Sequence, residues 1–195
     1  MTNNIFFISD FHLGHEKILT FKRDDGTLLR DFSSIAEMNG TIVERWNSVV
    51  GVNDKVYILG DVAWGVDNLM WLNAMKGRKV LIKGNHDNLF NVRKFLPYFD
   101  DIHGVKPLSI KGFKCVLSHV PMHPMCLNRW DINIHGHTHS NHVQREPDSA
   151  YEAAHLSPRI DDRYVNVCCD EVDYTPVHLD TIIKSQKLIK EGVLL

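Results

Sequence analysis

The chain has 195 residues, a hydrophobic fraction of 44% and a formal net charge of −2 at pH 7. This length and composition suit one compact domain over residues 1–195 that buries its own core. The near-neutral charge argues against a protein drawn to nucleic acid or membranes by its overall charge, although a local patch or a metal could still bind nucleic acid.

Short apolar runs alternate with helix-like segments in the first half of the chain. The apolar runs are too brief for helices, and they predict buried strands at 5–8, 56–59 and 79–82. Helices are predicted at 15–22, 33–50, 68–76 and 89–96. The second of these helices begins with Ser33-Ser34 followed by Glu37, which resembles a capping box.

The second half changes to short strands with brief connections, predicted at 102–110, 113–118, 132–135 and 164–168, with a hairpin turn at Lys111-Gly112. Residues 140–163 are polar and irregular, which indicates a loop-rich insertion near the functional site. A final helix is predicted at 179–190. This order of elements predicts a layered α/β sandwich in which helices cover two sheets.

Five motifs, each placed just after a predicted strand, carry the side chains with metal-ligating chemistry. Ligands of α/β proteins sit beyond the carboxyl ends of the strands, so we expect these motifs to meet at one edge. In an extended segment, residues two apart project to the same side, which would let Asp10 and His12 reach one metal and would put His137 beside His139. The motifs are Asp10-Phe11-His12, Gly60-Asp61, Gly84-Asn85-His86-Asp87, Ser118-His119 and Gly136-His137-Thr138-His139.

The ligand types indicate which metals and which chemistry are possible. Imidazole and carboxylate ligands without thiolate suit Mn²⁺, Fe, Co or Zn, rather than Ca²⁺ or Mg²⁺ alone, and argue against a structural zinc site. One carboxylate can bridge two cations. Two cations about 3.5–4 Å apart can clamp a phosphoryl group and activate a water. An imidazole, with an ordinary pKa of about 6.5, is suited to protonate the leaving group.

The ordered string of motifs resembles the calcineurin-like metallophosphoesterase superfamily. The resemblance implies a four-layer α/β/β/α sandwich of two mixed sheets flanked by helices, and a dinuclear metal-dependent phosphoesterase with Mn²⁺ favoured and Fe, Zn, Co or Ni as alternatives. It also implies the two ligand sets. One metal would be held by Asp10, His12, Asp61 and His139, and the second by Asp61, Asn85, His119 and His137, with Asp61 bridging.

The same resemblance assigns catalytic roles within the third motif. It implies that His86 donates the proton to the leaving group and contacts the phosphate together with Asn85, and that Asp87 orients His86. The sequence departs from the family pattern at Ser118, where glycine is usual. The stretches Asp10–His15 and Asn166–Val177 resemble a small phage and bacterial branch of the superfamily.

Several residues outside the motifs have two interpretations. His15, Trp64 and His123 are candidates for substrate contact, but His15 could equally be solvated or cap a helix, and surface roles compete for the other two. His135 and the helix residues Trp46 and Trp71 are better explained by core packing. Cys168 and Cys169 are expected to pack as small apolar residues.

The sequence therefore predicts an enzyme that hydrolyses a phosphate mono- or diester by metal-bound hydroxide, without a phosphoenzyme. A small nucleotide or cyclic nucleotide is the favoured substrate. A nuclease is the alternative, disfavoured by the small size and near-neutral charge. A non-catalytic scaffold that binds partners through a vestigial metal site is an alternative of another class, and the complete ligand set argues against it. The oligomeric state is open.

The expected location is the reducing cytoplasm. No apolar run approaches the roughly 20 residues of a membrane span, and the N-terminus shows no basic region followed by a long apolar stretch, so we expect no signal peptide. The four cysteines show neither CxxC spacing nor the density of a disulfide scaffold.

Overall fold

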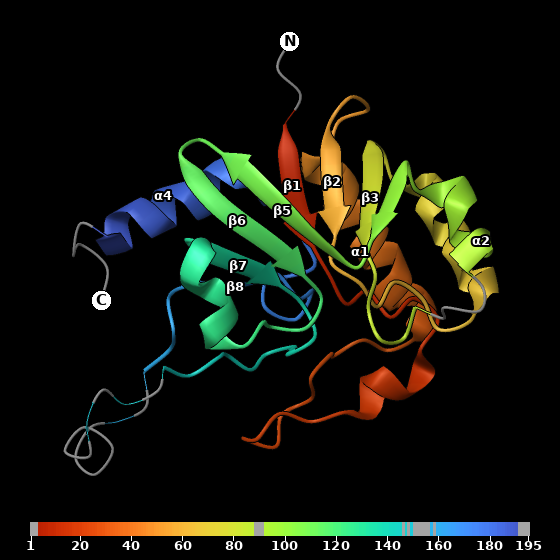
Figure 1. The fold of residues 1–195 in the computed structure, drawn as a ribbon. Helices are drawn as coiled ribbons and strands as arrows, with labels where there is room; N and C mark the ends of the chain where they lie inside the picture. The colour runs from red at the N-terminus through yellow and green to blue at the C-terminus, as the bar shows by residue number, and fades with distance from the viewer. Residues whose placement is uncertain are drawn as a thin grey trace.

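A computed structural model describes residues 4–87, 92–145, 147, 149, 157 and 159–190 (Figure 1). Its first sheet has the strand order β4-β3-β2-β1-β9. The strands β1, β2, β3 and β4 are parallel to one another, and β9 runs antiparallel to β1 at the edge of the sheet. The strands are β1 (Ile5–Ile8), β2 (Lys55–Ile58), β3 (Arg78–Ile82), β4 (Asp101–His103) and β9 (Val177–His178).

The second sheet has the order β5-β6-β7-β8. β5 is antiparallel to β6, whereas β6, β7 and β8 are parallel. Both sheets are therefore mixed. The carboxyl ends of β1, β2, β6 and β7 converge on one place (Figure 1). The strands are β5 (Val105–Ile110), β6 (Phe113–Ser118), β7 (Ile132–His135) and β8 (Tyr164–Asn166).

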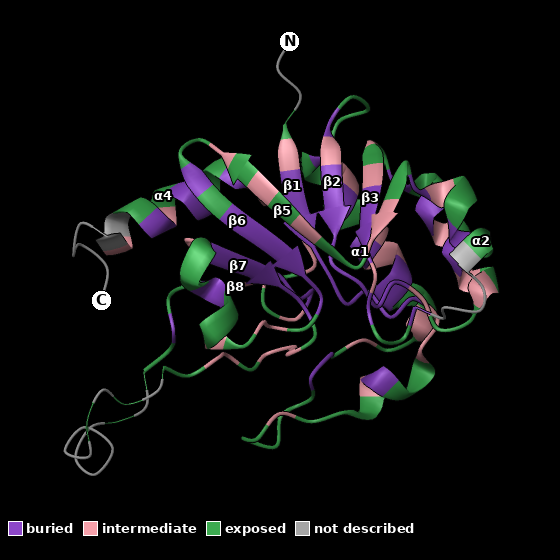
Figure 2. Cartoon of the chain, in the orientation of Figure 1, coloured by how far each residue is buried: buried purple, intermediate pink, exposed green. Residues whose placement is uncertain are grey.

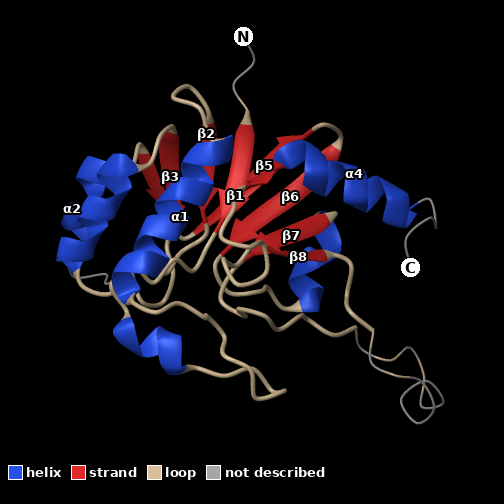
Figure 3. Ribbon diagram, turned by 180° about the vertical axis from the view of Figure 1, so that it is seen from behind, coloured by secondary structure: helices blue, strands red, loops and turns tan. Residues whose placement is uncertain are grey.

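Helices flank the two sheets. α1 (Ile35–Val49) and the 3-10 helix η2 (Val66–Ala74) pack on the outer face of the first sheet (Figure 3). The predicted capping box forms at the start of α1, where Ser34 Oγ accepts the Glu37 N–H at 3.2 Å and the Glu37 carboxylate accepts the Ser33 N–H at 2.8 Å. The remaining described helices are η1 (Glu16–Thr20), α2 (Val92–Phe95), η4 (Leu96–Tyr98), η5 (Pro124–Arg129) and α4 (Leu179–Lys190).

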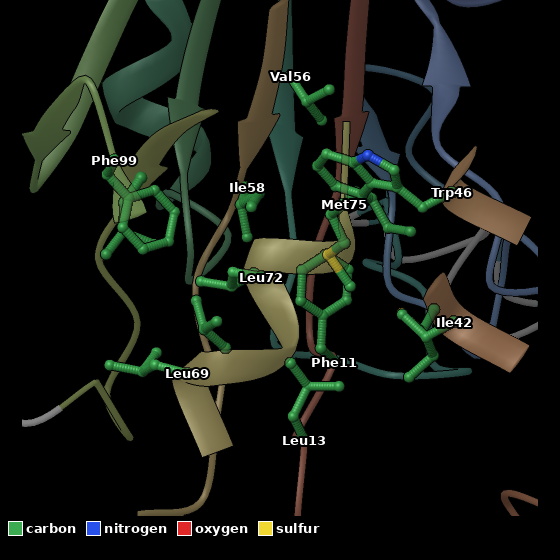
Figure 4. Close-up of a cluster of buried hydrophobic side chains, with 14 of the residues drawn as sticks. Phe11, Leu13, Ile42, Trp46, Val56, Ile58, Leu69, Leu72, Met75 and Phe99 are labelled. Carbon is green, nitrogen blue, oxygen red and sulfur yellow. The ribbon is translucent and has the colours of Figure 1, made fainter. Parts of the chain in front are cut away.

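The hydrophobic core has two main parts, one on each face of the first sheet. Phe6 and Ile8 join the cluster beneath α1 and η2 (Figure 4), whereas Phe7 joins the cluster between the two sheets. Since both faces are covered, the central strands β1, β2 and β3 carry continuous apolar runs, as the sequence predicts. Figure 2 shows β1, β2 and β3 as largely buried, with exposed residues on the helices and connections around them.

The predicted architecture of two mixed sheets flanked by helices is confirmed. The outer face of the second sheet carries a small third cluster in which Leu127 of η5 packs with Val116 and Tyr164. α4 contributes Leu179, Ile182 and Ile183 to the cluster between the sheets. Among the described residues, the helix packed on this outer face is the short 3-10 helix η5.

The largest error in the sequence prediction concerns the segment 102–110. It is two strands that separate at Gly104, with β4 in the first sheet and β5 in the second. A chain that crosses between sheets keeps its alternation of side chains, so its sequence pattern does not reveal the crossing. The strand β9 and the helix η5 were also missed, because two residues and a 3-10 turn carry little periodicity.

The predicted helices differ in type and length. The segments predicted at 15–22 and 68–76 are 3-10 helices. The helix predicted at 89–96 lies partly outside the described residues. Its described part is α2, and the 3-10 helix η4, which contains Pro97, follows directly. In the predicted insertion 140–163 the described residues form no helix, and one isolated bridge pairs Gln144 with Ile160. Across the described ranges, no helix has the length and apolar character needed to cross a membrane.

Candidate metal centre

The strand-end motifs meet where the two sheets join. The bridge between Ser9 and Cys168 links the end of β1 to the segment after β8. Around it lie two groups of three potential ligands, and within each group the ligand atoms are all within 4.8 Å of one another. We call Asp10, His12 and His139 the first group, and Asp61, His119 and His137 the second group.

Asp61 stands between the two groups. Its Oδ2 lies 3.4 Å from His119 Nε2 and 3.7 Å from His12 Nε2. Its Oδ1 accepts the backbone N–H of His86 at 2.9 Å. One carboxylate oxygen is therefore fixed by the backbone while the other faces both groups, which is the arrangement a bridging ligand requires.

Asp10 is divided in the same way. Its Oδ2 accepts the His137 N–H at 2.9 Å and the Cys168 thiol at 3.1 Å. Its Oδ1 and the Nε2 of His12 lie 3.8 Å apart, and both are buried with no hydrogen-bond partner among the described residues. Burying unpaired polar atoms is costly, so a cation between these two atoms would remove the penalty.

His119 supplies a second test of whether a metal fits. Its Nδ1 lies 2.7 Å from the carbonyl oxygen of Leu59, to which it can donate. Its Nε2 then faces Asp61 Oδ2, with Asn85 Oδ1 at 2.7 Å and His137 Nδ1 at 3.2 Å. A single proton can satisfy only one of these acceptors, whereas a divalent cation can bind all of them. The donor set therefore fits a metal, and it includes Asn85 as a neutral ligand.

The protonation states of His12 and Asp61 favour ligation at neutral pH. Burial, reinforced by the charge of Arg30, lowers the pKa of His12 to about 3, so its imidazole keeps a free lone pair. Burial alone would raise the pKa of Asp61, but the hydrogen bond and charge of His119, the His86 N–H and the charge of His12 together outweigh it and lower the pKa to about 2. Neutral imidazole and ionised carboxylate are the forms that bind metals.

The ligands are held on an unusual backbone. Asp10, His12, Asp61, His137 and His139 all have left-handed φ values, between 50° and 73°. This conformation costs a non-glycine residue about 1–2 kcal/mol, and such strain gathers at functional sites. The expectation that Asp10 and His12 lie on an extended segment is thus wrong, because both are left-handed, although they do reach the same place.

Core packing fixes the first motif. Between and after the ligands, Phe11 and Leu13 are fully buried in the cluster beneath α1 and η2 (Figure 4). The chain therefore alternates between anchors that enter the core and ligands that face the site. Within this cluster, Phe11 stands edge-on to Trp46, with ring centroids 6.0 Å apart.

The small residues of the motifs allow close approach of neighbouring loops. A Cβ on Gly136 would lie 2.4 Å from Asp10 Oδ2, and one on Gly60, whose φ is +90°, would lie 2.6 Å from His119 Nδ1. Ser118, which replaces the usual glycine, is accommodated because its Oγ donates to the Val120 carbonyl at 2.8 Å and accepts from Asn133 at 2.9 Å.

Two residues outside the motifs brace the first group, and sequence reasoning missed both. Asp170 Oδ2 lies 2.7 Å from His139 Nδ1, which directs the other ring nitrogen toward the metal site. Arg30 is paired with Asp170 at 2.7 Å and donates to the carbonyls of Asp10 and Phe11. Asp170 lies in a stretch that the branch resemblance included, but nothing in the sequence marked Arg30.

The role expected for Asp87 needs correction. Its carboxylate accepts the N–H groups of Asp61, Val62 and Gly84 at 2.8–2.9 Å. These bonds use both oxygens, and no hydrogen bond among the described residues joins them to the His86 ring. Asp87 therefore holds the loop that carries Asp61, because three inward-pointing N–H groups surround its buried carboxylate.

The residues proposed for substrate contact lie at the exposed side of the centre, with one exception. His86 is exposed, with its ring 5.6 Å from that of His12 and 5.5 Å from that of Trp64. His15 stacks on Trp64 at 4.2 Å. His123 instead caps η5, its Nδ1 accepting the Met125 N–H at 3.3 Å.

A cavity of about 430 Å³ adjoins both ligand groups. His137 and His139 form one wall, and Phe21 with the following loop forms another. Its size lies within the range of small-molecule pockets. The remaining lining residues are Lys22, Arg23, Asp24, Leu29, Thr138, Ser140 and Asn141.

Comparison with known proteins places this centre in a family. The model of the calcineurin-like phosphoesterase superfamily domain matches residues 4–158. The chain belongs to the calcineurin-like phosphoesterase superfamily. The matched residues include all five motifs and both ligand groups.

Members with similar sequences come from archaea and phages. An uncharacterized protein of Methanocaldococcus jannaschii, MJ1445, is 32% identical, with 96% of this chain and 92% of that protein covered. The gene 66 protein of Mycobacterium phage L5 is 31% identical, with coverages of 71% and 78%. The crystal structure of AQ665 from Aquifex aeolicus, a protein of unknown function, superposes with a TM-score of 0.67 at 26% identity and covers 94% of this chain and 100% of its own.

Proposed function

We propose that this protein is a metal-dependent phosphoesterase that hydrolyses a small phosphate ester, with a nucleotide-like diester or monoester as substrate. The observation that carries the proposal is the position of Asp61 Oδ2, 3.7 Å from a ligand of the first group and 3.4 Å from a ligand of the second. Membership of the calcineurin-like superfamily supports it.

Seven residues would hold two divalent cations, with Mn²⁺ favoured by the mixed oxygen and nitrogen donors. When bound, such a pair supplies Lewis-acid activation of water and neutralises the charge of the phosphoryl group. The residues are Asp10, His12 and His139 for one cation, Asn85, His119 and His137 for the other, and Asp61 shared.

The protein's own residues orient the substrate and move the proton. His86 is exposed beside the first group, and its backbone N–H is fixed on Asp61 Oδ1 at 2.9 Å. From this position its imidazole donates a proton to the leaving oxygen. Asn85, next to it, would help to hold the second cation and would contact the phosphate. Asp87 keeps the loop of Asp61 in place and takes no direct part in the proton transfer.

Metal dependence and Asp61 together test the proposal. Protein stripped of metal should be inactive toward bis(4-nitrophenyl) phosphate and 4-nitrophenyl phosphate, and added Mn²⁺ should restore the activity. Asp61→Asn should abolish activity and remove both metals by elemental analysis, whereas Asp162→Asn, at an exposed turn, should change neither. Full activity in the presence of a chelator would refute the mechanism.

The role of His86 is tested separately. His86→Ala should lower kcat by about 10²–10⁴-fold, the usual contribution of general acid–base catalysis, while two metals per chain remain. Loss of metal from this variant would contradict the assignment of His86. A panel of nucleotides, 2′,3′- and 3′,5′-cyclic nucleotides and short oligonucleotides then decides the ester class, and cleavage of the oligonucleotides alone would favour a nuclease.

A further inference from the structure

Three rings form a continuous row along the exposed side of the metal centre. Trp64 stacks on His15 with ring centroids 4.2 Å apart and an interplanar angle of 14°. Phe21 meets His15 edge-on at 5.8 Å. Trp64 and Phe21 keep 48% and 44% of their surface exposed, which is high for large aromatic residues. We refer to Phe21, His15 and Trp64 as the aromatic rim.

The aromatic rim rests on a fixed backbone. The Trp64 N–H donates to the Leu13 carbonyl at 2.9 Å, and the Trp64 carbonyl accepts from the Asn68 side chain at 2.7 Å. Leu13 itself is fully buried. An exposed ring held this firmly loses little further entropy when a ligand covers it, so it is preorganised for binding.

The rim is also continuous with the proposed chemistry. The Trp64 ring lies 5.5 Å from that of His86, the proposed proton donor, and the His15 ring lies 5.6 Å from that of His12, a ligand of the first group. A group attached to a phosphate at the metals therefore has the rim within reach on the side of His86.

We propose that the aromatic rim binds the flat base of a nucleotide substrate, with Trp64 as the main stacking surface. This inference rests on the proposed phosphoesterase function and names its substrate class. Aromatic side chains bind bases by stacking, with little dependence on the identity of the base. The rim therefore provides affinity for a nucleoside group, and it favours nucleotides over phosphate esters of aliphatic alcohols.

Two ligands that differ only in the base provide the test. AMP and ribose 5-phosphate carry the same phosphate, so the ratio of their inhibition constants in Mn²⁺-loaded protein measures what the base contributes. We expect AMP to bind roughly 5- to 100-fold more tightly in the unmodified protein. Trp64→Ala should bring the ratio close to one, and Trp64→Phe should retain most of it.

Controls separate the rim from general damage and from the proposed function. Met70→Ala removes a side chain that is 65% exposed on η2, and it should leave the ratio unchanged. Quenching of tryptophan fluorescence by AMP, but not by ribose 5-phosphate, would report binding of the base at the aromatic rim. This measurement does not require any ester to be hydrolysed.

Each result has a definite meaning. A ratio near one in the unmodified protein, or an unchanged ratio in Trp64→Ala, overturns the aromatic rim while leaving metal-dependent hydrolysis intact. Asn141→Ala changes the wall of the cavity, so a loss of the AMP preference in this variant alone would place the base in the cavity and would also overturn the rim. Absence of any metal-dependent hydrolysis, with AMP still quenching Trp64, would refute the phosphoesterase and keep the rim.

Discussion

The two ligand groups have similar chemistry but different surroundings. In the first group, Asp10 and His12 are buried, and His139 is braced by the buried pair of Asp170 with Arg30. In the second group, His137 is exposed, and the brace on His119 is the neutral carbonyl of Leu59. One half of the centre is thus enclosed and charge-braced, while the other half opens toward solvent.

This difference predicts that the two halves differ in metal affinity and in access for the substrate. Outer-shell partners fix ligand orientation, and losing one typically costs 10–100-fold in metal affinity. We therefore expect the first cation to be held more tightly than the second. The open half is the side on which a substrate phosphate can enter, because Asn85 and His137 are both exposed there.

The largest expected effect comes from removing one ligand from each half. Both His137 and His139 have left-handed φ values, so glycine removes the imidazole without adding backbone strain. His137→Gly should release one Mn²⁺ and keep the first tightly bound, whereas His139→Gly should weaken the first site. Titration calorimetry with Mn²⁺ and elemental analysis measure this. Equal losses in the two variants would contradict the inequality.

A smaller effect is expected from the brace of the first group. Asp170→Asn leaves the Arg30 charge buried without its partner, which should lower the free energy of unfolding by about 3 kcal/mol. It should also weaken the first metal by about 10–100-fold. Asp100→Asn, which breaks the exposed pair with Arg78, is the matched control and should do neither. Normal metal affinity in Asp170→Asn, measured well below its melting temperature, would show that the pair serves stability alone.

The smallest effect is expected at the residue that departs from the family pattern. Ser118→Gly removes the hydrogen bonds of Ser118 Oγ with Val120 and Asn133, which should cost about 1 kcal/mol of stability. The His119 ring keeps its bond to Leu59, so two metals per chain should remain. Chemical denaturation and metal analysis check both points. A loss of the second metal would show that the serine positions His119.

The sequence predicted that the candidate ligands lie together, because each motif follows a short apolar strand, and the structure brings six of them into two groups. Its geometric reason for pairing Asp10 with His12 was wrong, since both residues are left-handed and alternate with core anchors. Left-handed backbone at aspartate and histidine leaves no mark in composition or periodicity. The ligand types were thus visible in the sequence, and the strain that positions them was not.

The parts that were missed depend on contacts between distant segments. Arg30 and Asp170 lie 140 positions apart, and an isolated arginine in a loop reads as a solvated surface residue. Asp87 was assigned to its neighbour His86, although its partners are the N–H groups of another loop. The crossing at Gly104 was hidden for the same reason, because sheet membership is decided by pairing partners.

The bridge between Ser9 and Cys168 has a consequence for when the protein acquires its metals. Cys168 bonds to Asp10 across 158 positions, and Asp170 lies two residues after Cys168. Segments emerge from the ribosome in order from the N-terminus, so the first group cannot be braced until the chain has been made as far as Asp170. Metal stabilises the state that binds it. A chain that ends before Cys168 would gain little of this stabilisation, so a bound metal would favour chains in which both segments are present.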